Sequence, residues 1–76
     1  MSLRKRWRPL TRSTVGETPD AYGVVEFGDE SGEVLEATAG LLPDVLREEL
    51  SYGSAAKVRW KRAQSSDHAE RLLDDL

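Results

Sequence analysis

The chain has 76 residues, of which 38% are hydrophobic and 33% are charged, and its formal net charge is −3. This length predicts one small domain, and the composition is typical of a globular protein rather than a disordered one. Cysteine is absent, which excludes disulfides, thiol catalysis and cysteine-built zinc sites. No apolar run is long enough to span a bilayer. We therefore expect a cytoplasmic protein without a membrane partner or a cofactor.

The charges divide the chain into a basic beginning and an acidic remainder. Residues 1–12 carry five basic residues and no acidic one, whereas residues 13–76 carry six basic and fourteen acidic residues. The basic residues of the first segment are Arg4, Lys5, Arg6, Arg8 and Arg12. Arginine outnumbers lysine eight to three, and an acidic, lysine-poor surface suits a salt-rich cytoplasm. We therefore expect a halophilic, haloarchaeal source.

Residues 1–19 predict an extended arm, with Trp7 and Leu10 as anchor points and a closing turn at Pro19. The basic charge of this arm has three interpretations. It is a tail that contacts nucleic-acid phosphates, a segment that folds back on the acidic body, or a targeting segment. No apolar stretch follows its first basic residues, which disfavours a secretory signal.

The next segment predicts a β-hairpin. Alternating residues favour a strand from Ala21 to Phe27 and a second strand from Glu33 to Thr38. The polar, glycine-bounded residues 28–32 between them are typical of a hairpin loop.

Two helices and a third strand follow. A helix is predicted from Leu42 to Leu50, where Pro43 suits the first turn. The alternating segment from Lys57 to Arg62 predicts a strand with Val58 and Trp60 on one face. Apolar residues at helical spacing predict a second helix from Ser65 to Leu76.

These elements predict an α+β fold in the order β-β-α-β-α. The fold is a small, three-stranded, mainly antiparallel sheet with two helices. Residues 1–18 form the basic N-terminal arm, and residues 19–76 form the domain.

This layout resembles the GIY-YIG domain, the nuclease module of DNA-repair excision enzymes and some homing endonucleases. The resemblance covers residues 18–76 and is carried by the layout and by two segments, PDAYGVVEFGD at 19–29 and GEVLEATA at 32–39. It implies a mechanism in which a tyrosine helps to activate water, an arginine contacts the phosphate, and a carboxylate holds one divalent metal ion.

The catalytic residues of that family are replaced in this chain. The first motif tyrosine falls on Val25, which has no proton to exchange, and the second falls on Glu36. A degenerate GIY-YIG domain without catalysis is therefore expected.

The other two catalytic positions are displaced along the helices. The motif arginine aligns near Val45 or Leu46, just before Arg47, and the metal-binding carboxylate aligns near Leu73, one residue before Asp74. One residue rotates a helical side chain by about 100°. Neither residue therefore replaces the family's catalytic group, and no metal is expected.

The acidic residues of the hairpin have two interpretations. Glu26, Glu33 and Glu36 form either a carboxylate cluster for Mg²⁺, with Glu26 and Glu36 paired across the hairpin, or a solvated acidic face. The solvated face is the favoured interpretation.

The third strand carries a basic stripe. Lys57, Arg59 and Lys61 either meet phosphates or pair with Glu33 or Glu36 on a neighbouring strand, and pairing is slightly favoured. The full set of candidate nucleic-acid-binding residues is Arg4, Lys5, Arg6, Arg8, Arg12, Lys57, Arg59, Lys61 and Arg62. The aromatic residues Trp7, Tyr22 and Trp60 offer stacking surfaces for single-stranded nucleic acid, although the strand spacing favours a core position for Trp60.

The sequence therefore predicts a non-catalytic binding module for nucleic acid. The alternative is a domain for protein interaction or homo-oligomerisation, and a minor alternative is an active metal-dependent nuclease. No small-molecule substrate is evident.

Overall fold

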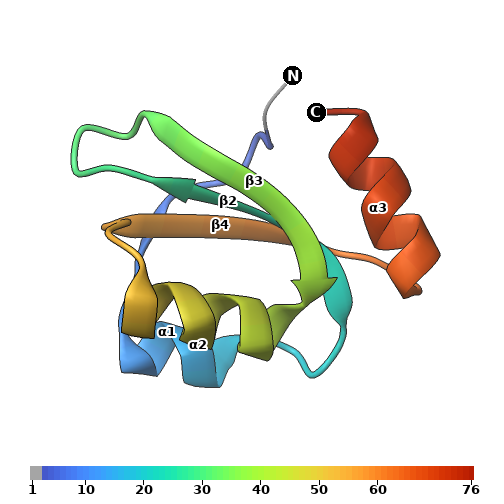
Figure 1. Cartoon of the computed structure of the whole chain (residues 1–76), viewed down its shortest axis with the longest axis horizontal. Helices are drawn as coiled ribbons and strands as arrows, with labels where there is room; N and C mark the ends of the chain where they lie inside the picture. Colours follow the sequence, from blue (N-terminus) through green and yellow to red (C-terminus); the bar gives the residue numbers. More distant parts are fainter. Residues whose placement is uncertain (1–2) are drawn as a thin grey trace.

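The computed structural model describes residues 3–76 (Figure 1). Over these residues it contains four strands and three helices. In chain order they are β1 (Arg8–Pro9), α1 (Arg12–Glu17), β2 (Tyr22–Gly28), β3 (Val34–Leu41), α2 (Leu42–Tyr52), β4 (Lys57–Arg62) and α3 (Ser66–Asp74). The predicted α+β class is confirmed. The predicted layout of three strands and two helices is wrong, because the arm itself supplies a strand and a helix.

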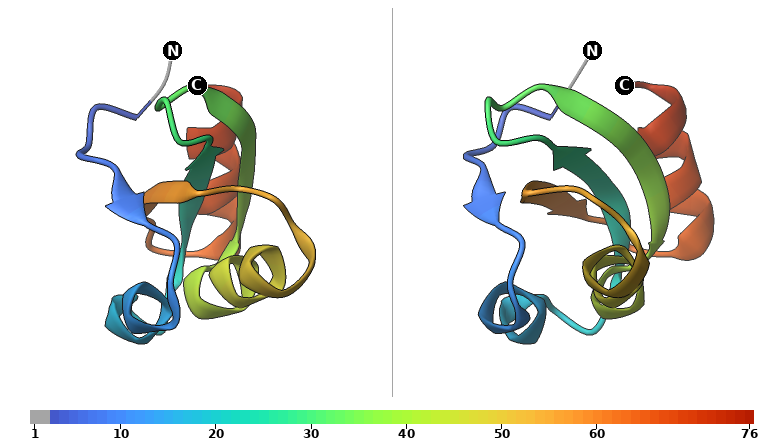
Figure 2. Two further views of the ribbon diagram at one scale, coloured as in Figure 1. Left: turned by 90° about the vertical axis from the view of Figure 1, so that its left-hand side faces the viewer. Right: turned by 60° about the vertical axis from the view of Figure 1, so that its left-hand side comes forward.

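The four strands form one antiparallel sheet in the order β1-β4-β2-β3. β2 and β3 pair as the predicted hairpin, and β4 pairs with the other side of β2. Helix α2 packs on one face of the sheet beside α1, whereas α3 packs on the opposite face against β2 and β3 (Figure 2). β2 therefore lies in the middle of the molecule, where the side chains from Val24 to Phe27 are buried on both faces, while Tyr22 at its start is exposed.

The main core lies between the sheet and helices α1 and α2. Its buried members are Leu10, Val25, Phe27, Leu42, Leu46 and Val58. Trp60 packs against this cluster but is only half-buried, and Leu72 of α3 is also half-buried. The expectation that Trp60 is a core residue is therefore correct for only part of its side chain.

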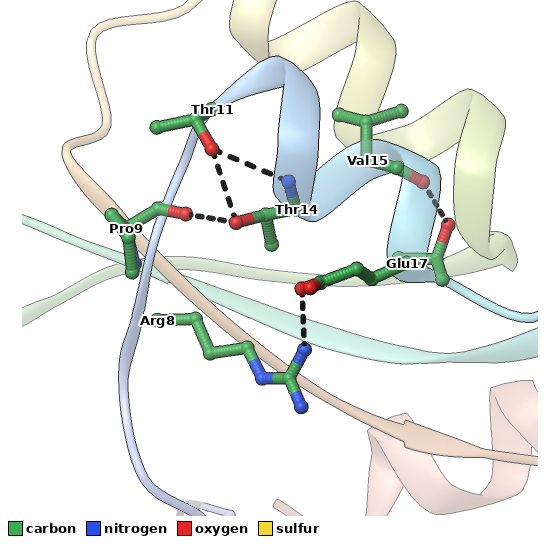
Figure 3. A network of polar contacts seen from close by, with 7 residues as sticks. Arg8, Pro9, Thr11, Thr14, Val15 and Glu17 are labelled. Atoms are coloured by element: carbon green, nitrogen blue, oxygen red, sulfur yellow. Dashed lines mark hydrogen bonds and ion pairs between the residues drawn. The ribbon is translucent and has the colours of Figure 1, made fainter.

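Helix α1 replaces the extended conformation that the sequence predicted for the end of the arm. Thr11 caps the helix, because its hydroxyl accepts a hydrogen bond from the amide of Thr14 at 3.2 Å. Leu10 precedes the cap and Val15 follows it, and both join the main core, as in a hydrophobic staple. The Thr14 hydroxyl donates to the Pro9 carbonyl at 2.7 Å, which ties α1 to β1 (Figure 3).

Within residues 3–76, no helix is long and apolar enough to cross a membrane.

Candidate nucleic-acid interface

The pairing of β1 with β4 brings the two basic segments of the chain together. Arg8 lies opposite Val58 and Pro9 lies opposite Lys57, so the arm runs beside the outer edge of β4 (Figure 2). We call these two adjoining segments the basic face; they carry eight of the eleven basic residues, whose side chains point to both sides of the sheet. These eight residues are Arg4, Lys5, Arg6, Arg8, Lys57, Arg59, Lys61 and Arg62. Arg12 is exposed at the start of α1.

The arm is held on the body by a buried carboxylate. Glu26 of β2 is only 2% exposed, and its Oε1 atom accepts hydrogen bonds from the Leu3 amide and from Arg59 Nε, each at 2.8 Å. The Arg59 side chain is nearly buried as well. A buried charge needs such a partner, because leaving it alone in a low-dielectric interior is costly. Residues of the arm therefore fold back on the acidic body.

A stacked pair fixes the middle of the arm. The guanidinium carbon of Arg59 lies 4.0 Å from the centroid of the Trp7 ring, a cation–π geometry. Trp7 also lies against Gly28, where a methyl group would come within 2.7 Å of the indole Cη2 atom. Arg59 donates in addition to the Lys5 carbonyl at 3.3 Å. Trp7 thus serves as the anchor point that the sequence predicted.

A second stack lies one residue further along both segments. The guanidinium carbon of Arg8 lies 4.9 Å from the centroid of the Trp60 ring. Arg8 Nη1 also forms an ion pair with Glu17 of α1 at 3.1 Å (Figure 3). This exposed ion pair adds little stability, but it limits the positions that the guanidinium occupies.

Two of the hollows along the basic face lie beside Lys5. The first has a volume of about 320 Å³ and no acidic residue in its lining, which consists of Lys5, Arg6, Arg8, Arg59 and Trp60. The second has a volume of about 590 Å³ and is lined by four apolar and four charged residues, namely Leu3, Val24, Leu72 and Leu76 with Arg4, Lys5, Lys61 and Asp75. Both hollows share Lys5, so they adjoin along the outer edge of β4.

The cations of the basic face have different roles. Arg59 forms an ion pair with Glu26, and Arg8 forms an ion pair with Glu17. Five others, Arg4, Lys5, Arg6, Lys61 and Arg62, are exposed and have no ion pair within the described part of the chain. Long, exposed cations of this kind are the side chains that neutralise phosphates.

Comparison with protein families gives one result. A family model described as "Domain of unknown function (DUF7508)" matches residues 1–76. The chain belongs to this family. Comparison with the curated proteins and with the solved structures found no match.

The DUF7508 domain does not pair its basic stripe as the sequence suggested. Glu33 and Glu36 lie at the end of the sheet away from β4, because β2 separates β3 from β4. Arg59 pairs with Glu26 instead, which lies opposite it on β2. The favoured pairing with Glu33 or Glu36 was therefore wrong.

The possible carboxylate cluster of the hairpin is also absent from the described structure. Glu26 lies opposite Ala37 and Glu36 lies opposite Phe27, so the two carboxylates project from different faces of the sheet. Glu33 and Glu36 are exposed, as expected for a solvated acidic face, but Glu26 is buried. No group of three or more potential ligands capable of holding a metal occurs within residues 3–76.

The positions that align with the GIY-YIG catalytic residues lie in different environments. Val25 is completely buried in the main core, whereas Glu36 is exposed on β3. Arg47 forms an exposed ion pair with Asp44 at 3.2 Å. Asp74 is exposed near the end of α3. These side chains therefore do not meet in one site.

The hairpin loop contains an ordered carboxylate. Asp29 Oδ1 accepts hydrogen bonds from the Ser31 hydroxyl at 2.7 Å and from the amides of Ser31 and Glu33, each at 2.9 Å. These hydrogen bonds, led by that of the Ser31 hydroxyl, hold the pKa of Asp29 below its ordinary value. Gly32 completes the turn with φ +89°, a conformation that favours glycine.

Sequence analysis missed the role of Glu26, although a signal was present. Glu26 is the one charged residue in a strand whose other members include Val24, Val25 and Phe27. An acid inside such an apolar strand indicates burial beside a cationic partner.

Proposed function

We propose that this DUF7508 domain is a non-catalytic, nucleic-acid-binding module that contacts phosphates through the basic face. The observation that carries the proposal is the pairing of β1 with β4, which places two basic segments about fifty residues apart in the chain side by side at one edge of the sheet. Arg4, Lys5, Arg6, Lys61 and Arg62 are the main phosphate contacts, because they are exposed and outside the ion pairs of the described structure.

The arrangement of the other elements supports a degenerate GIY-YIG-like scaffold for this module. A hairpin is followed by α2, by β4 on the other side of β2, and by α3. Burial of Val25 and exposure of Glu36 support the absence of nuclease catalysis. A cytoplasmic location and a halophilic source belong to the same proposal and rest on composition alone.

Fluorescence anisotropy with labelled, mixed-sequence DNA and RNA tests phosphate binding. The full chain is expected to bind at low salt, with an affinity that falls linearly on a logarithmic scale as salt rises. Circular dichroism at each salt concentration shows that the domain is folded. Absence of binding at low salt by a folded domain would overturn the proposal.

A second candidate function is homo-oligomerisation through β3. β3 is the outer strand at the end of the sheet opposite β1, and its side chains Val34 and Leu35 are 43% and 53% exposed. An open edge strand with apolar side chains is a surface on which a second strand pairs. Light scattering is expected to show a dimer that the substitution Leu35→Glu dissociates. A monomer at 100 micromolar protein, on the order of the concentration at which weak dimers form, would contradict this candidate.

A further inference from the structure

We propose that the Arg8–Trp60 stack binds one base of a single-stranded nucleic acid, while Lys5 and Arg6 hold the adjoining phosphates. This inference rests on the proposed function and names its ligand class. The four side chains line the same hollow of about 320 Å³. A nucleotide offers an aromatic plane next to an anion, and this hollow offers a stacking platform next to two exposed cations.

The platform is built in layers from the core outwards. Trp60 lies opposite Val25 on β2 and packs against the main core, so part of its indole ring is in contact with buried side chains. Arg8 lies over the indole, and half of its side-chain surface stays exposed. An arginine plane that is stacked on an aromatic ring on one side accepts a base on the other side.

The platform is also held in place before the ligand arrives. β1 pairing fixes the backbone of Arg8, and the bond from Thr14 to the Pro9 carbonyl fixes the next residue. Glu17 binds the Nη1 atom at the rim of the guanidinium, which leaves the face of the guanidinium plane available. Restricting a flexible side chain in advance lowers the entropic cost of binding.

These features favour a single strand over a duplex. In a duplex the bases stack on one another, and their faces are not available to a protein side chain. A duplex would therefore use only the cations of the hollow, whereas a single strand uses the cations and the stack. Single-stranded DNA and RNA both present this chemistry.

The two tryptophans of the chain make the base contact measurable. Affinities are measured on the wild type, because Trp7 anchors the arm. The substitution Trp7→Phe, which keeps an aromatic ring against Arg59, leaves Trp60 as the only tryptophan for the emission measurement, and circular dichroism checks that the variant is folded. Four ligands are titrated while Trp60 emission is recorded: a DNA strand, an RNA strand of the same sequence, an abasic strand of equal length and charge, and a duplex.

We expect the DNA strand, the RNA strand or both to change Trp60 emission and to bind about tenfold more tightly than the abasic strand. Equal affinities for the base-bearing and abasic strands, with unchanged Trp60 emission, would overturn the stacking inference but leave phosphate binding intact. Failure of all four ligands to bind the wild-type domain would overturn the proposed function itself.

A charge-preserving substitution gives a second test. Arg8→Lys keeps the cation but removes the planar guanidinium. We expect it to abolish most of the tenfold advantage of the base-bearing strands while the affinity for the abasic strand stays the same. The matched control is Arg71→Lys on the exposed surface of α3, which should alter neither affinity. An unchanged advantage in Arg8→Lys would overturn the inference.

Discussion

The guanidinium of Arg59 stacks on the indole of Trp7, with 4.0 Å between the guanidinium carbon and the ring centroid. At the next residue of each segment the two residue types are exchanged, because Arg8 of the arm lies over Trp60 of β4. Successive residues of a strand point to opposite faces, so the arm and β4 form one tryptophan–arginine stack on each side of the sheet. The two stacks attach the arm to the body and position its remaining cations.

The close approach of Trp7 to Gly28 predicts a large effect of a small substitution. A methyl group at Gly28 would lie 2.7 Å from the indole and 3.1 Å from the Glu33 carbonyl oxygen. We expect Gly28→Ala to displace Trp7 and to lower the free energy of unfolding by about 2 kcal/mol. Urea unfolding measures this loss.

Gly16 provides the matched control for Gly28. It lies in α1, and a methyl group there would meet nothing within 4 Å. Alanine favours a helix over glycine, so Gly16→Ala should raise the free energy of unfolding by about 0.5 kcal/mol. Equal effects of the two substitutions would contradict the packing of Trp7 on Gly28.

The buried ion pair predicts strong coupling between two substitutions. Glu26→Gln leaves the nearly buried Arg59 without a counter-charge, and we expect it to cost about 3 kcal/mol. The double variant Glu26→Leu with Arg59→Met removes both charges and should cost less than Glu26→Leu alone. Urea unfolding of the single and double variants measures the coupling. If the loss in the double variant equals the sum of the losses in Glu26→Leu and Arg59→Met, the two side chains are not coupled.

The hairpin loop predicts a dependence of stability on acid pH. The pKa of Asp29 is lowered in the folded state by its hydrogen bonds. The ionised carboxylate therefore stabilises the fold above its unfolded-state pKa, and this stabilisation is lost as the pH falls through the lower folded-state pKa. The advantage of the wild type over Asp29→Asn should be largest above about pH 5 and should shrink in acid. An advantage that stays constant or grows as the pH falls would contradict this assignment.

Much of the fold was predictable from local patterns in the sequence. The strand Lys57–Arg62 has the predicted bounds, and both later helices were found near their predicted positions. Helix α1 was missed because its six residues include Gly16 and two β-branched residues, which are poor helix formers. Its stability comes from the Thr11 cap and from the packing of Val15 on the core.

The basic residues of the candidate site could be identified from the sequence, but their proximity in the folded chain could not. The basic residues of the arm and of β4 were both identified from the sequence. Their adjacency follows from strand order, which local patterns do not determine. The same reason explains the wrong partner of Arg59, because only the position of β4 beside β2 places Glu26 opposite it.

The most direct measurement compares the salt dependence of DNA binding in two double variants with equal charge. Lys5→Ala with Arg6→Ala removes two exposed cations from the basic face, whereas Arg47→Ala with Arg71→Ala removes two cations from α2 and α3. We predict that the first variant weakens binding and lowers the slope of log affinity against log salt by about 1.5, and that the second variant keeps the wild-type slope. Identical slopes in the two variants would contradict phosphate binding by the basic face.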